Sequence, residues 1–183
     1  MMFLKTLLPA LAVLATSAAP APLFLASSSA QAEPATFTHK GLAKDGERYE
    51  SYLKSHWKPG KQKSAELISA AAKALSTDAR LAARNYAMAV VGEPGNVEAW
   101  IGLAEALLAI KPDANKGSER FDLPVNASGA AYIAQERAAN KTTRAKALAV
   151  LGQALKRRAF WRPAIESLKA SVTLAADAGV QAE

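Results

Sequence analysis

Two stretches of this chain decide its fold: WIGLAEAL at residues 100–107 and LAVLGQAL at residues 148–155. Each places a large apolar residue first, a leucine three positions later, a small residue beside it, and a second leucine at the end. Side chains at this spacing lie on one face of an α-helix. Nearby helical segments carry alanine followed four positions later by a large residue, as in Ala82 with Tyr86. The pattern predicts pairs of helices that pack small residues against large ones.

This pattern resembles the tetratricopeptide repeat, a helical hairpin of 34 residues that stacks on its neighbours. Pro94 precedes Trp100 by the spacing found between the proline closing one repeat and the large residue opening the next. Leu103 and Leu151 are 48 positions apart, so a 34-residue repeat has gained about 14 residues between them. The polar stretch 112–126 fits such an insert. The resemblance implies an all-α fold of about three hairpins in a short solenoid.

In such a stack, small residues are expected where helices cross closely, and large residues where a groove has to be filled. The expected close contacts are Ala82, Gly152 and Ala164, and the expected fillers are Tyr86, Trp100, Leu107, Leu155 and Leu168. The alternative is an alanine-rich helical bundle that matches the repeat pattern by chance.

Residues 1–32 have the character of a secretory signal. A lysine precedes an apolar run over residues 7–15, and Ala30-Gln31-Ala32 fits a cleavage site. The run is too short to span a bilayer, so we expect export and removal of the segment, or its retention as an uncleaved anchor. Residues 33–44 are polar and irregular, which predicts a flexible tether. A bacterial periplasm is the expected location.

Capping residues and prolines indicate where the helices begin and end. The repeat domain is expected over residues 45–183. Its expected helices are Glu47–Lys58, residues 64–75 capped by Ser64, residues 79–91 capped by Thr77 or Asp78, residues 97–110 capped by Asn96, residues 128–139 closed by Asn140, a helix from Thr142 or Thr143 to Arg158, and a last helix with Pro163 in its first turn that runs towards Ala176.

The chain has a formal net charge of +7, and part of this excess lies close to two aromatic residues. Basic residues at positions 156–158 and 162 surround Phe160 and Trp161. Such a cluster is able to bind nucleic acid or an anionic polymer. Trp161, however, lies in an expected turn where these repeats commonly place a packing aromatic. We therefore expect a packed tryptophan, solvated arginines and no nucleic-acid partner.

The residues that support catalysis are scarce. The chain has two histidines, His39 and His56, and no cysteine, which excludes disulfides and thiolate metal sites. No zinc-protease or serine-hydrolase motif occurs. Gly60-Lys61 followed by Ser64 lacks the upstream glycine and the preceding strand of a phosphate loop. We expect a protein that is not an enzyme and uses neither a cofactor nor a metal.

Two surfaces compete as binding sites for a partner. The first is the face formed by the leading helix of each hairpin, which in tetratricopeptide proteins usually recognises peptides. On this chain its candidate residues are Glu98, Ile101, Glu105, Lys146, Gln153, Lys156 and Arg157. The second is the insert, where Phe121 is expected to fold onto the groove as a plug, with a direct contact to a partner as the alternative.

Three further stretches resemble the N-terminal helical region of large exported proteobacterial alpha-2-macroglobulin family proteins. They are GERYESYL at 46–53, SERFDLP at 118–124 with Ala130-Ala131-Tyr132, and LKRRAFWRPA at 155–164. The resemblance implies a module in front of β-sandwich domains that trap proteases in the bacterial envelope. This sequence contains no β-rich domain, bait region or Cys-Gln thioester, so inhibition would belong to a part of the protein outside it.

From these observations we expect an exported docking or spacing module of an alpha-2-macroglobulin-like envelope protease inhibitor. Its partner would be a protein or peptide, and no membrane span would remain after cleavage of the signal segment. The alternative is a free-standing periplasmic adaptor. Such an adaptor would bind a peptide or an anionic cell-wall polymer through the basic last hairpin.

Overall fold

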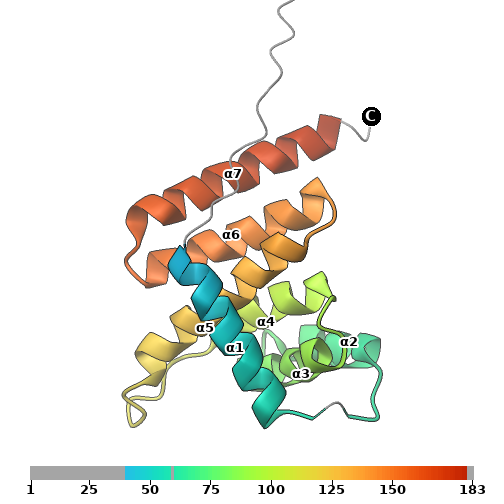
Figure 1. The fold of residues 1–183 in the computed structure, drawn as a ribbon. Helices are drawn as coiled ribbons and strands as arrows, with labels where there is room; N and C mark the ends of the chain where they lie inside the picture. Colours follow the sequence, from blue (N-terminus) through green and yellow to red (C-terminus); the bar gives the residue numbers. More distant parts are fainter. Residues whose placement is uncertain (1–39, 59, 181–183) are drawn as a thin grey trace, which may run out of the picture. The chain divides into compact units, whose positions relative to one another are not determined.

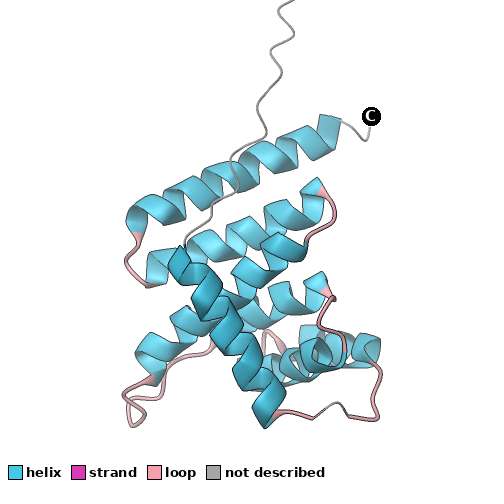
Figure 2. Cartoon of the chain, viewed as in Figure 1, coloured by secondary structure: helices cyan, strands magenta, loops and turns pink. Residues whose placement is uncertain are grey.

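The computed structural model describes residues 40–58 and 60–180, and this part of the chain is all-α, with no strand (Figures 1 and 2). All of it belongs to one compact unit over residues 32–183. The predicted signal segment, residues 1–32, and residues 33–39 of the predicted tether lie outside the described residues. The helices are α1 (Lys40–His56), α2 (Ser64–Ala74), α3 (Ala79–Gly92), α4 (Val97–Ala109), α5 (Glu119–Arg137), α6 (Lys141–Arg157) and α7 (Trp161–Val180).

Helices α2 to α7 follow one another in space in the order of the sequence. Each of them packs against the next, and α4 also contacts both α2 and α6. Helix α1 is the exception, because it makes no packing contact with α2 and lies instead across α5, with a smaller contact to α3 (Figure 1). The described part of the chain therefore forms a stack of six helices with one additional helix against its side.

Side-chain caps begin three of these helices. The side chains of Asp78, Asn96 and Asn140 accept hydrogen bonds from the backbone N–H groups of Leu81, Ala99 and Thr143, at 2.9, 3.1 and 2.8 Å. Each bond satisfies an N–H group that has no partner within its helix. The predicted cap Asn96 is confirmed, and Asp78 rather than the alternative Thr77 caps α3. The interpretation of Asn140 is wrong, because it begins α6 rather than closing the preceding helix, and the N-cap of α2 is Lys63 rather than Ser64.

The predicted insert and tether are shorter than expected. Helix α5 begins at Glu119, so only the first half of the stretch 112–126 is a loop. Pro124 lies inside the helix and is buried, although its ring removes one helical hydrogen bond. Residues 40–44 of the predicted tether form the first turn of α1, where Leu42 is buried. In both places burial of apolar side chains extends the helix beyond the local signals.

The core contains most of the predicted contacts. Trp100 is completely buried, and its indole N–H donates to the Pro94 carbonyl at 2.8 Å. A methyl group on Gly152 would lie 2.6 Å from Leu168, so a small residue is required there. Leu168 therefore fills the space over Gly152 as predicted, although it remains 37% exposed. The other predicted close contacts and fillers are buried: Ala82, Tyr86, Leu107, Leu155 and Ala164.

Helix α1 is held to the stack by a charged network as well as by packing. Arg158, at the end of α6, donates to the Asp45 carboxylate at 2.8 Å and to the Ser128 hydroxyl at 2.6 Å. These three residues belong to α1, α5 and the α6–α7 turn, and the Arg158 side chain is largely buried. The expectation that Arg158 is a solvated arginine is therefore wrong, because it joins three elements.

Candidate binding surfaces

The residues predicted to bind a partner lie on α4 and α6, and the structure brings two of them together. The Lys146 Nζ atom lies 3.7 Å from Glu98 Oε1. Ile101 is 4% exposed and belongs to the core, so its prediction as a contact residue is wrong. A residue that packs between helices is not accessible to a partner. The six exposed candidates are Glu98, Glu105, Lys146, Gln153, Lys156 and Arg157.

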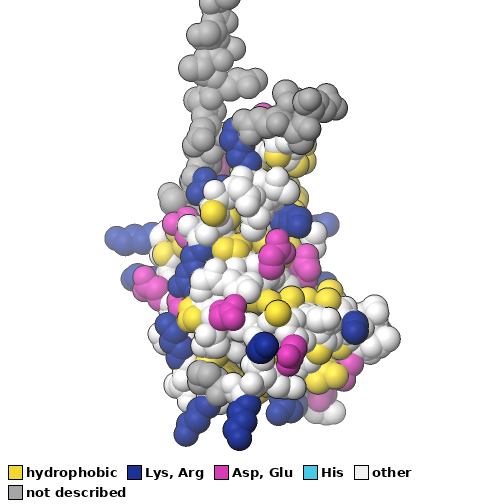
Figure 3. Space-filling view, turned by 90° about the vertical axis from the view of Figure 1, so that its right-hand side faces the viewer, with side chains coloured by type: hydrophobic (Ala, Val, Ile, Leu, Met, Phe, Trp, Pro, Cys, Tyr) yellow, Lys and Arg dark blue, Asp and Glu magenta, His cyan; other side chains and the backbone are white. Residues whose placement is uncertain are grey.

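Glu98 and Glu105 lie on the same side of α4 and create a local acidic environment. Partial burial and the nearby Glu98 raise the pKa of Glu105, and Lys146 opposes this shift. Burial raises the pKa of Tyr86, and the two glutamates raise it further. This part of α4 therefore favours a cationic or hydrogen-bond-donating group. Acidic side chains also lie across the middle of the face in Figure 3, with lysine and arginine along its lower edge.

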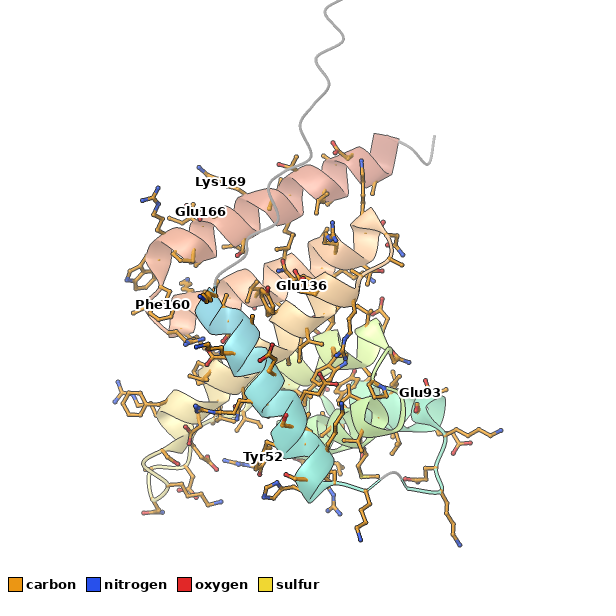
Figure 4. The ribbon with its side chains drawn as sticks, viewed as in Figure 1. Tyr52, Glu93, Glu136, Phe160, Glu166 and Lys169 are labelled. Carbon is orange, nitrogen blue, oxygen red and sulfur yellow. The ribbon has the colours of Figure 1, made fainter. Side chains whose placement is uncertain are left out.

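The turn between α6 and α7 exposes aromatic side chains beside basic ones. Trp161 is 59% exposed and Phe160 is 42% exposed, so the prediction of a packed tryptophan is wrong. Lys156 and Arg157 are exposed on the preceding turn of α6. Ala159 adopts a φ of 61°, which reverses the chain between the two helices. Figure 4 shows Phe160 at this turn.

The insert does not cover a groove. Phe121 is 69% exposed on α5, so the predicted plug is wrong and the alternative of a direct contact remains. A cavity of about 340 Å³ lies beside it, between the start of α5 and the end of α6. Its lining includes Pro124, Arg157 and Arg158. The exposed ring therefore lies next to an apolar hollow with a cationic edge.

A cleft between α1 and α3 was not predicted. It has a volume of about 330 Å³, and Leu103, Leu107 and Ile110 contribute to its lining together with aromatic and basic side chains. The guanidinium group of Arg84 lies 5.6 Å from the ring centre of Trp57, and burial raises the pKa of Tyr49. Tyr49, Tyr52 and Trp57 fall at helical spacing within the predicted helix Glu47–Lys58, but this spacing does not specify the helix that they face. Such a lining suits an aromatic or anionic group.

Helix α7 has an exposed apolar side that the sequence analysis also missed. Trp161, Ile165, Leu168 and Val172 follow one another at helical spacing and are all exposed. A groove of about 470 Å³ between α6 and α7 begins beside the C-terminal end of this series, where Ser171 and Ala175 line it. A series of exposed apolar residues on one helix face is a common mark of an interaction surface.

Neither a metal centre nor a membrane-spanning helix is found in the described part of the chain. No group of three or more metal-ligating side chains occurs among those residues, and none of their helices is long and apolar enough to cross a bilayer. Comparisons with models of protein families, with curated proteins and with solved structures find no match. Function therefore has to be inferred from the surfaces themselves.

Proposed function

We propose that α2–α7 are three tetratricopeptide-like hairpins and that the chain acts as a module that docks or spaces other polypeptides. The repeat is supported by a small residue at the same position in the second helix of each hairpin. Ala82, Ala130 and Ala164 occupy corresponding positions in α3, α5 and α7, and all three are buried. Helix α4 contacts α2 and α6 in addition to its direct neighbours, as expected when leading helices line one side of a stack.

One observation carries the function: the last hairpin exposes aromatic side chains beside basic ones. Phe160 and Trp161 lie next to Lys156 and Arg157, and exposed aromatic and arginine side chains are typical of the centres of protein interfaces. We therefore propose that the α6–α7 turn contacts a protein or peptide. The leading context is the N-terminal part of an exported alpha-2-macroglobulin-like protease inhibitor of the bacterial envelope, on the strength of the sequence resemblance described above.

Affinity capture from a periplasmic extract would test this proposal. The tagged full-length chain would be compared with Lys156→Glu/Arg157→Glu and with Lys61→Glu/Lys63→Glu, a matched charge reversal of exposed lysines before α2. Recovery of one specific protein by the unchanged chain and by the second variant, with its loss in the first, is the expected result. Equal recovery by all three chains would argue against a site on the last hairpin.

The same cluster supports a second candidate, a free-standing adaptor that binds an anionic cell-wall polymer. The basic side chains would neutralise the charges of such a polymer, and the exposed rings would stack on it. The interaction weakens as salt screens the charges. Binding of the isolated chain to a purified anionic polymer, measured from about 0.05 to 0.5 M salt, separates the two candidates. Saturable binding that falls steeply with salt favours the adaptor.

A further inference from the structure

The exposed apolar side of α7 corresponds to a buried side of α3. Aligning Ala82 with Ala164 pairs Tyr86 with Leu168 and Val90 with Val172. Tyr86 and Val90 are 5% and 2% exposed, whereas Leu168 and Val172 are 37% and 70% exposed. Helix α4 packs against α3 and places Gly102 on Tyr86, where a methyl group would lie 2.3 Å from the ring. Corresponding side chains are therefore covered by a neighbouring helix in α3 and exposed in α7.

The middle hairpin repeats the covered arrangement. Ala134 of α5 corresponds to Tyr86 and is completely buried, and α6 packs against both α5 and α4. Two of three corresponding surfaces are therefore filled by a helix that lies against both helices of the preceding hairpin. On the third surface, between α6 and α7, no helix of the described chain is present.

The shape and charge of this surface define what fits it. The groove of about 470 Å³ between α6 and α7 is lined by small residues, including Ala149, Ser171 and Ala175, so a helix is able to approach closely. Lys146 also lines it and lies 3.7 Å from Glu98 of α4. Lys156 lies on the same side of α6, about two turns beyond Ala149, and Lys169 is exposed on α7 (Figure 4). An apolar surface with cationic edges favours an occupant whose edges are acidic.

We propose that the groove between α6 and α7 binds an acidic amphipathic α-helix, which packs on Leu168 and Val172 as α4 packs on α3. This inference deepens the proposed interaction function and rests on it. Helix α4 is an example of the required chemistry, because it presents Glu98 and Glu105 beside an apolar face with Gly102 at its centre. The last hairpin of the chain then provides a binding site for a helix in addition to the exposed aromatic turn.

Two peptides from this chain provide a matched pair of probes. The peptide of residues 96–110 contains Glu98 and Glu105 and no basic residue, whereas the peptide of residues 140–157 is amphipathic and basic and contains Gly152. Each would be fluorescently labelled and titrated with the full-length chain while anisotropy is measured. We expect saturable binding of the acidic peptide and at least about tenfold weaker binding of the basic one, a difference that falls as salt is added.

Substitutions locate the site. Val172→Glu and Ile165→Glu place a charge on exposed positions in the surface and are each expected to weaken binding of the acidic peptide about tenfold or more. Leu81→Glu is the control, since Leu81 is an exposed apolar residue on α3, and it is expected to leave affinity within about twofold. Circular dichroism would establish that all three variants melt as the unchanged chain does.

Three results would overturn the proposal. They are the absence of saturable binding up to about 1 mM peptide, equal affinity for both peptides, and a dimer in sedimentation experiments that Val172→Glu dissociates. The last result would assign the surface to a second copy of the chain. Capture of a partner at the α6–α7 turn with no peptide binding would reject the groove and leave the proposed function intact.

Discussion

Gly129 of α5 and Gly46 of α1 meet backbone to backbone where the two helices cross. A methyl group added to Gly129 would lie 3.0 Å from the Asp45 carbonyl oxygen and 3.1 Å from the Gly46 amide nitrogen. The three atoms nearest to this point are backbone atoms of α1, which cannot rotate away as a side chain can. The approach of α1 to the stack therefore depends on the missing side chains of two residues.

Gly129→Ala is expected to destabilise the protein by about 1 kcal/mol, because overpacking costs about 1–3 kcal/mol and the better helix propensity of alanine returns at most about 1. Urea denaturation would measure the loss. Gly95→Ala is the control, since nothing lies within 4 Å of a methyl group at that position. A stability equal to that of the unchanged chain would mean that α1 shifts without loss.

Asn140→Ala is expected to lower the free energy of unfolding by about 1 kcal/mol, because the side chain caps α6. Asn115→Ala provides the comparison, since Asn115 is exposed in the loop before α5 and a surface change of this kind stays within about 0.5 kcal/mol. Thermal and urea denaturation would measure both. Equal losses in the two variants would contradict the assignment of Asn140 as the cap.

Arg137 and Glu50 are expected to show an energetic coupling of about 0.5–1.5 kcal/mol. The guanidinium group lies 2.8 Å from the Glu50 carboxylate of α1 and also donates to the Pro94 carbonyl. A double-mutant cycle with Arg137→Met and Glu50→Gln measures the interaction free energy between the two side chains. Strictly additive effects would show that the salt bridge adds nothing beyond the contact of Arg137 with Pro94.

Glu119 should make stability depend on acidic pH. Hydrogen bonds from Arg80 and from the Asp113 backbone lower the pKa of Glu119 to about 2. A carboxylate whose pKa is lower in the folded state stabilises that state above its unfolded pKa, near 4.3, and this stabilisation is lost as pH falls towards 2.

The variant Glu119→Gln tests this dependence. It should melt at a lower temperature than the unchanged chain at pH 7, and the difference should shrink as pH falls from about 4.5 to 2. Lys116→Gln, which removes a more distant cation 3.7 Å from Glu119, should change the melting temperature less. A difference between Glu119→Gln and the unchanged chain that stays constant with pH would show that the ion pair does not contribute.

Local signals predicted the helical content and several helix starts. Asp78 and Asn96 were identified correctly because a cap depends on residues within one turn. The second half of the insert was missed because Pro124 disfavours a helix interior and Phe121 has only moderate helix propensity, and α5 is stabilised there by tertiary contacts. The start of α1 was missed for the same reason, since burial of Leu42 depends on packing across the stack.

The candidate sites were harder to predict than the helices. Exposed and buried apolar residues have the same spacing in a sequence, so the exposure of Leu168, Ile165 and Val172 was not predicted. Ile101 was expected on a binding face, whereas α4 contacts four other helices and buries most of its circumference. The cleft between α1 and α3 depends on segments far apart in sequence, which no single-helix pattern specifies.

The position of α1 also bears on the order in which the molecule folds. Gly46 meets Gly129, and Asp45 meets Arg158, so α1 docks on residues that follow it by about 80 to 110 positions. Each of the helices α2 to α7, in contrast, packs against its neighbour in the sequence. Distant contacts form slowly because a long loop must close first. Helix α1 is therefore expected to be the last helix to dock, after α5 and α6 have been synthesised, although it comes first among the described helices.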